Sequence, residues 1–140
     1  MIFRIIFILS FLFLFNACAH RSKDQLFQAL GGYDGINRIV HQLILEIAKD
    51  PVVKPRYKDV NLQPFKSGLT NYICNITGGP CDYHNDSMRD VHAGHNYTHT
   101  EFNALVTDLI KAMETQNVPV TTQNQLLNLL AKSYKDVVYH

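Results

Sequence analysis

The stretch that decides the fold runs from Val91 to Phe102 and reads "VHAGHNYTHTEF". Three of the seven histidines of the chain lie in it, at spacings of three and four residues: His92, His95 and His99. On one continuous helix these imidazoles would share a face and could hold a zinc ion with an open coordination position. Gly94 and Asn96 interrupt the segment, however, and Thr98-x-x-Glu101 has the pattern of a capping box, where a new helix begins. The segment therefore reads as the end of one helix, a bend and the start of the next.

Three interpretations of this segment follow. The histidines form a zinc site, or they line a solvated corner, or one of them binds a metal and the other two are bystanders. For the third interpretation His92 is the candidate, because it lies one helical turn after Met88 and precedes an apolar stripe that begins at Phe102. A neutral imidazole that faces an apolar slot is suited to be the proximal ligand of a haem iron.

The sequence after the N-terminal segment predicts helices joined by short turns. Apolar residues recur at helical rather than alternating spacing, and no convincing strand pattern is present, so the fold class is all-α. Glycine pairs are expected to end helices, and Pro64 suits the first turn of one. Thr122-x-x-Gln125 has the pattern of a second capping box. The expected helices cover residues 24–30, 33–49, a turn within 51–60, 64–77, 87–93, 98–113 and 122–137.

Length and charge narrow the class of protein. A chain of 140 residues is long enough for one domain with a buried core. The formal net charge is +1 and the basic residues are scattered, so the sequence gives no electrostatic reason to expect a nucleic-acid partner.

The N-terminus predicts export. Arg4 precedes an apolar run, Ile5–Phe15, which is shorter than the roughly 20 residues that span a bilayer but suits the core of a signal peptide. Residues 1–18 are expected to be a lipoprotein signal that leaves a lipid anchor on Cys18, with ordinary signal cleavage and an uncut anchor as alternatives. Residues 19–24 would be a short linker. The expected location is the periplasmic side of a bacterial membrane, with the outer membrane preferred.

Two further cysteines, Cys74 and Cys81, bracket the sequence "NITGGP". In an oxidising compartment an even pair can form a disulfide, provided that the two Cα atoms lie about 4.4–6.8 Å apart. Two unpaired thiols are the alternative.

The region over residues 25–138 resembles the truncated haemoglobins, most closely their group I. The matching motifs are, in order, "LFQALGGYDGI", "LEIAKDP", Gly78-Gly79-Pro80 with Tyr83, Met88-x-x-x-His92-x-Gly94, Thr98 with Phe102, and Val118-Pro119. An ordered set that spans nearly all of this region is far more specific than one glycine pair. The resemblance implies a truncated globin domain, folded as a two-over-two helical sandwich around a b-type haem (heme b) whose iron takes a diatomic gas.

The resemblance also assigns site residues. The histidine of the Met-x-x-x-His-x-Gly segment is the iron ligand of the family, so His92 is the expected axial ligand. Met88 and Phe102 fall where the family contacts the haem, and Tyr83 matches the tyrosine after the second glycine motif. Five other histidines match no family role and are expected at the surface, with His95 as a neighbour of the proximal side: His41, His84, His95, His99 and His140.

The residues expected opposite His92 depart from the family pattern. The position of the family's distal tyrosine falls on Ile44, and positions that often include a glutamine fall on Phe65 and Leu69. The phenylalanine that usually covers the haem from the connector falls on Tyr57. A hydrogen bond to a charged group is worth about 1.5–3 kcal/mol, so losing the polar donor would speed O₂ release by roughly one to two decades. We therefore expect an apolar pocket that holds NO or CO better than O₂, unless Tyr57 or Tyr72 turns a hydroxyl inward.

Three functions are compatible with these residues. The first is an exported haem protein that reversibly binds O₂, NO or CO. The second is a haem enzyme that removes NO or peroxide, which would need an external electron donor because the chain has no flavin or reductase motif. The third is a histidine-rich module that binds a metal without haem.

Overall fold

The computed structural model describes residues 24–84 and 86–139, so the expected signal segment, Cys18 and His140 lie outside the described residues. The described residues form the following elements: α2 (Gln25–Ala29), α3 (Gly32–Ile47), the 3₁₀ helix η2 (Lys54–Tyr57), α4 (Leu62–Ile76), α5 (Met88–His92), α6 (His99–Thr115), α7 (Val120–Leu130), the 3₁₀ helix η3 (Ala131–Ser133) and α8 (Tyr134–Val137). In this part of the chain no strand forms, and one isolated bridge joins Tyr97 to Val138. None of the helices described is long and apolar enough to cross a membrane.

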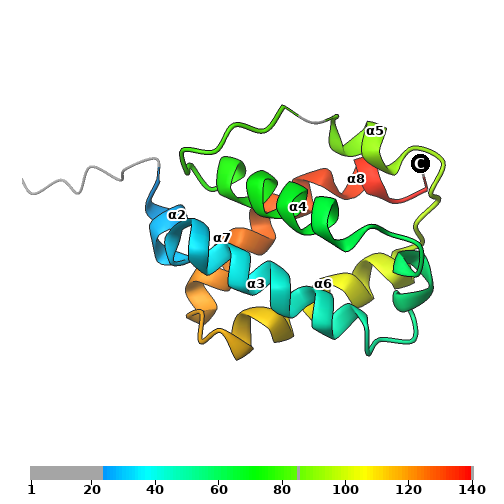
Figure 1. Cartoon of the computed structure of the whole chain (residues 1–140), viewed down its shortest axis with the longest axis horizontal. Helices are drawn as coiled ribbons and strands as arrows, with labels where there is room; N and C mark the ends of the chain where they lie inside the picture. Colours follow the sequence, from blue (N-terminus) through cyan, green and yellow to red (C-terminus); the bar gives the residue numbers. More distant parts are fainter. Residues whose placement is uncertain (1–23, 85, 140) are drawn as a thin grey trace, which may run out of the picture.

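Helix α3 is the centre of the core because its apolar residues recur at helical spacing and face both α4 and α6. Its buried side chains are Ile36, Ile39, Val40, Leu43 and Ile47, each at most 4% exposed. Helices α4 and α6 add Ile73, Leu109 and Met113 to the same cluster. Figure 1 shows α3 and α4 side by side with α6 and α7 behind them; α6 packs against α3, and α7 packs against α2 and α6. The predicted all-α, two-over-two arrangement is confirmed.

The segment after α4 is tied back onto the core. Cys74 and Cys81 form a disulfide with a Cα–Cα distance of 5.8 Å, which is one of the two alternatives that the sequence left open. The Asn75 side-chain amide donates to the Cys81 carbonyl at 3.0 Å. At Gly79 an added Cβ would lie 2.5 Å from the Phe27 ring and 2.6 Å from the Cys74 sulfur, so this close approach requires glycine.

The short helix α5 is positioned by its ends. The Ser87 hydroxyl accepts the Asp90 backbone N–H at its start. None of the five residues of α5 is buried. Beyond it, Gly94 and Asn96 adopt positive φ angles of 79° and 50°, which produce the predicted bend.

One capping box is confirmed and the other is wrong. Thr98 and Glu101 cap α6 reciprocally, as predicted. Helix α7 instead begins at Val120 with Pro119 as its N-cap, and Thr122 is a buried residue inside the helix. Thr122 fails as a cap because the fixed φ of Pro119 already starts the helix. The predicted last helix is also divided, since η3 separates α7 from α8.

Candidate functional site: a cavity between α4 and α5

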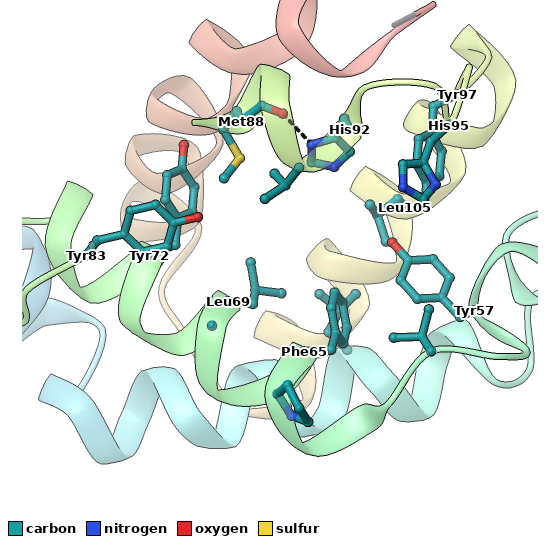
Figure 2. Close-up of a pocket in the computed structure, with 15 residues that line it drawn as sticks. Tyr57, Phe65, Leu69, Tyr72, Tyr83, Met88, His92, His95, Tyr97 and Leu105 are labelled. Carbon is teal, nitrogen blue, oxygen red and sulfur yellow. Dashed lines mark hydrogen bonds between the residues drawn. The ribbon is translucent and has the colours of Figure 1, made fainter. Parts of the chain in front are cut away.

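A cavity of about 370 Å³ separates α5 from the core helices (Figure 2). Its volume is in the range of pockets that bury a small organic ligand or cofactor. Helix α5 and the following loop form one wall, and α4, the η2 connector and α6 supply the opposite one. The lining residues are Leu43, Tyr57, Val60, Pro64, Phe65, Gly68, Leu69, Tyr72, Tyr83, Met88, Val91, His92, His95, Tyr97 and Leu105.

His92 stands at the last residue of α5 with its imidazole on the cavity wall. Its Nδ1 is 2.7 Å from the backbone carbonyl oxygen of Met88, one helical turn earlier. An N–H on Nδ1 donates to this carbonyl, so the lone pair of a neutral ring is on Nε2, which points toward the cavity in Figure 2. Burial lowers the pKa of His92, although the Met88 hydrogen bond opposes the change. The ring is therefore held in the neutral form that binds metals.

The wall opposite His92 is apolar. Phe65 and Leu69 project from α4, one helical turn apart, and Leu43 projects from α3. The Tyr57 ring packs against Phe65 with centroids 5.3 Å apart. Figure 2 shows Phe65 and Leu69 across the cavity from His92.

Tyrosines mark the two ends of the cavity, and their hydroxyls have partners within the protein (Figure 2). At one end the Tyr72 hydroxyl is 3.0 Å from the Ser133 hydroxyl, and the Tyr83 hydroxyl donates to the Asp86 carbonyl at 3.3 Å. At the other end burial raises the pKa of Tyr57, with a further increase from the neighbouring Tyr97 hydroxyl. Tyr57 and Tyr72, the two residues that could have restored a polar donor, thus direct their hydroxyls toward other side chains.

Two predicted cofactor contacts lie outside this cavity. Ile44 lines a separate apolar cavity of about 200 Å³, which Tyr57 and Phe65 share with the first. Leu43, which lies on the buried stripe of α3, lines the main cavity instead. Phe102 packs edge-on against Tyr134, with centroids 4.8 Å apart, and its neighbour on α6 at the cavity is Leu105.

The other six predicted contact residues line the cavity. These residues are His92, Met88, Phe65, Leu69, Tyr57 and Tyr83. Sequence reasoning missed Arg56 and Tyr97, whose roles depend on contacts between distant segments. Arg56 reaches Glu101, which lies 45 residues away, and no local pattern signals such a pair.

The three histidines of the opening segment do not converge. His95 lies on the cavity rim near the Tyr97 ring, at a centroid distance of 6.1 Å. His99 stacks on Tyr134 and bonds to its hydroxyl. Among residues 24–84 and 86–139, no group of three or more histidine, cysteine, aspartate or glutamate side chains is arranged to hold a metal ion.

A two-over-two helical sandwich that presents one neutral imidazole to an apolar wall defines a globin-type protein. The family model described as bacterial-like globin matches residues 25–138, and the chain belongs to this family. Among curated proteins, the chain is 22% identical to the group 1 truncated haemoglobin of Tetrahymena thermophila over 116 residues, which cover 83% of this chain and 96% of that protein. It is 28% identical to the group 1 truncated haemoglobin of a Nostoc species over 93 residues, covering 66% and 79% of the two chains.

Solved structures show the same fold. The truncated haemoglobin of Tetrahymena pyriformis in its Fe(III) form superimposes with a TM-score of 0.79 at 21% identity, covering 82% of this chain and 98% of that one. The 2/2 haemoglobin of Synechococcus, solved in the cyanomet state with covalently attached haem, gives a TM-score of 0.75 at 18% identity, covering 81% and 97%.

Proposed function

We propose that the cavity binds a b-type haem and that His92 is the axial ligand of its iron. The residues fit this cofactor. The Nδ1 hydrogen bond to the Met88 carbonyl fixes the ring orientation and leaves Nε2 for the metal, which is the arrangement that metal-binding histidines need. Phe65, Leu69 and Leu105 supply apolar surface for the faces of a flat macrocycle.

Bound haem would supply an iron that takes a diatomic gas, and His92 would hold that iron. The residues on the cavity wall opposite His92 would decide which gas is held. Phe65 and Leu69 carry no hydrogen-bond donor, the Tyr72 hydroxyl is hydrogen-bonded to that of Ser133, and the Tyr57 hydroxyl lies beside that of Tyr97. O₂ gains more than CO or NO from a polar donor. The function is therefore reversible gas binding in which O₂ is released quickly, and the observation that carries it is one neutral histidine facing an apolar wall.

Absorption spectroscopy tests this function directly. The purified chain is expected to take up one equivalent of haem and to show a Soret band that shifts on reduction and on addition of CO. Stopped-flow measurement should give an O₂ dissociation rate faster by roughly one to two decades than that of a relative with a polar distal pair. An O₂ release as slow as in such a relative would disprove the apolar-pocket proposal. Sustained NO consumption with an added electron donor would assign an enzyme instead of a gas carrier.

We also propose that the chain is exported and anchored by lipid on Cys18, on the periplasmic side of a bacterial membrane. The Cys74–Cys81 disulfide supports export, since such bonds persist in oxidising compartments. Labelling cells with a tagged fatty acid tests the anchor. The wild-type chain should carry the label in the membrane fraction, and a Cys18→Ala variant should not. An unlabelled wild-type chain in the soluble fraction would contradict the anchor.

A further inference from the structure

Helix α5 needs an outside support, because it carries His92 but buries none of its own residues. A helix of five residues is also too short to be stable by its own hydrogen bonds. Helix α5 packs against α8, and the position of the imidazole depends on this contact and on the segments that flank α5. The loop after it, residues 93–98, accepts hydrogen bonds from a side chain far away in the sequence.

The Arg56 guanidinium provides these contacts from the opposite wall. It donates from Nη1 to the His95 carbonyl at 2.9 Å and from Nη2 to the Asn96 carbonyl at 3.4 Å. The same group donates from Nε and Nη2 to the two carboxylate oxygens of Glu101, at 2.6 and 3.0 Å. One planar fork thus bonds to two loop carbonyls and to the residue that caps α6. Lysine could not reproduce this geometry.

The contact continues to the iron ligand through Tyr97. The guanidinium carbon of Arg56 lies 5.2 Å from the centre of the Tyr97 ring. The Tyr97 ring in turn makes an edge contact with the His92 ring, and the two ring centroids are 5.7 Å apart. The Tyr97 carbonyl also accepts the Tyr139 backbone N–H at 3.0 Å, which fixes the residue from behind.

Arg56 is adjacent to Tyr57, which lines the cavity from the connector side. One side chain therefore links the connector, on the wall opposite His92, to the loop that follows His92. We call the hydrogen bonds of Arg56 to His95, Asn96 and Glu101 the Arg56 clamp. It sets the spacing between the two walls at this end of the cavity.

We infer that Arg56 is a positioning residue for the iron ligand, acting on His92 through the loop carbonyls and the Tyr97 ring. This inference rests on the proposed ligation of haem iron by His92. Arg56 does not contact the cavity itself, so it affects the cofactor only through the loop it holds.

The test compares Arg56→Lys with Arg89→Lys. At either site lysine keeps the positive charge but lacks the planar guanidinium and its several N–H donors. Arg89 is the matched control because it lies on α5 itself and makes a single exposed contact, to Asp136 at 3.4 Å. Three quantities are measured on the folded full chain: the iron–histidine stretching band of the reduced haem protein, the rate of haem transfer to an acceptor globin, and amide hydrogen exchange over residues 92–98.

Arg56→Lys is expected to shift or broaden the iron–histidine band and to accelerate haem loss and loop exchange by roughly ten- to hundredfold, because hydrogen bonds to a charged group are lost. Arg89→Lys should leave all three within about twofold of wild type, as exposed pairs contribute little. If Arg56→Lys lowers the melting temperature but leaves the iron–histidine band and loop exchange as in Arg89→Lys, Arg56 is only structural and the inference is overturned.

A second variant tests the same inference if Arg56→Lys does not fold. Glu101→Gln removes the ion pair and retains an oxygen that can cap Thr98, so it should give the same changes at smaller size. If the wild-type chain takes up no haem, the proposed function fails by itself. Loop exchange in Arg56→Lys and Glu101→Gln then still decides whether the clamp holds residues 92–98, and unchanged exchange overturns the inference.

Discussion

Phe65 and Leu69 stand on α4, a helix that shares the main hydrophobic core with α3, whereas His92 stands on α5, which buries no residue. The wall opposite His92 is fixed by packing over a large apolar area, so small changes there are absorbed by many contacts. The His92 wall is fixed by the packing of α5 against α8 and by a few directed interactions: the Met88 carbonyl, the Arg56 hydrogen bonds and the disulfide before α5. Single substitutions on the His92 side should therefore alter cofactor binding, while those on the other side should alter ligand preference.

The largest effect is expected from His92→Gly. Loss of the axial ligand should weaken haem binding by more than the roughly 10–100-fold that loss of an outer-shell partner costs. Free imidazole should restore the Soret band, because it can occupy the space that the side chain leaves. His95→Ala is the control, since His95 lines the same cavity without the Met88 hydrogen bond, and it should bind haem nearly as wild type does. Equal haem loss in both variants would contradict the assignment.

Removing the disulfide should be next in size. A Cys74→Ala, Cys81→Ala double variant is expected to lose about 2–3 kcal/mol of unfolding free energy, because a short loop is no longer closed in the unfolded chain. Urea denaturation measures the loss, and treating the wild type with a dithiol should reproduce it without a substitution. Amide hydrogen exchange shows which wall the bridge supports. In the double variant the exchange rate should rise more over residues 80–92 than over α3. A uniform rise would show that the bridge supports the whole core instead.

A polar donor opposite His92 should change ligand release without changing stability much. Leu69→Gln places an amide on the apolar wall, and the O₂ dissociation rate should fall by roughly one to two decades, since the donor stabilises charge on the ligand. Leu69→Met is the matched control, because it keeps a similar volume and adds no donor. Stopped-flow rates for O₂ and CO measure the effect. A CO rate slowed as much as the O₂ rate would point to blocked access rather than to hydrogen bonding.

The smallest effect is a pH dependence at the clamp. The Arg56 hydrogen bond, with help from Thr98, lowers the pKa of Glu101 from 4.5 to about 2. A carboxyl whose pKa is lowered by folding stabilises the protein above its unfolded pKa, so this stability is lost as pH falls from about 4.5 toward 2. The contribution should be roughly 1–2 kcal/mol, because solvent screens the pair. Thermal melts of the wild type and Glu101→Gln should differ at pH 6 and converge near pH 2, and a constant difference would contradict this assignment.

Much of this protein could be predicted before the structure was known. The apolar spacing of α3, the glycine motifs and the Thr98–Glu101 capping box act over a few residues, and the structure confirms each of them. His92 was predicted to be the iron ligand because its segment resembles that of a known family, and the structure adds the Met88 hydrogen bond. The second capping box was wrong because Thr122 and Pro119 compete for the same helix start, and a local pattern cannot rank them.

The sequence by itself determined the helices, the break within Val91–Phe102 and the lack of polar side chains at Phe65 and Leu69, because these properties depend on residues close together in the chain. Only the tertiary structure decided that Leu43 rather than Ile44 faces the cavity, and that the Tyr57 and Tyr72 hydroxyls turn toward other side chains. It also decided that Arg56 holds the loop after His92. These features depend on how helices pack and on contacts between residues 39 to 61 positions apart, whose geometry no local spacing specifies.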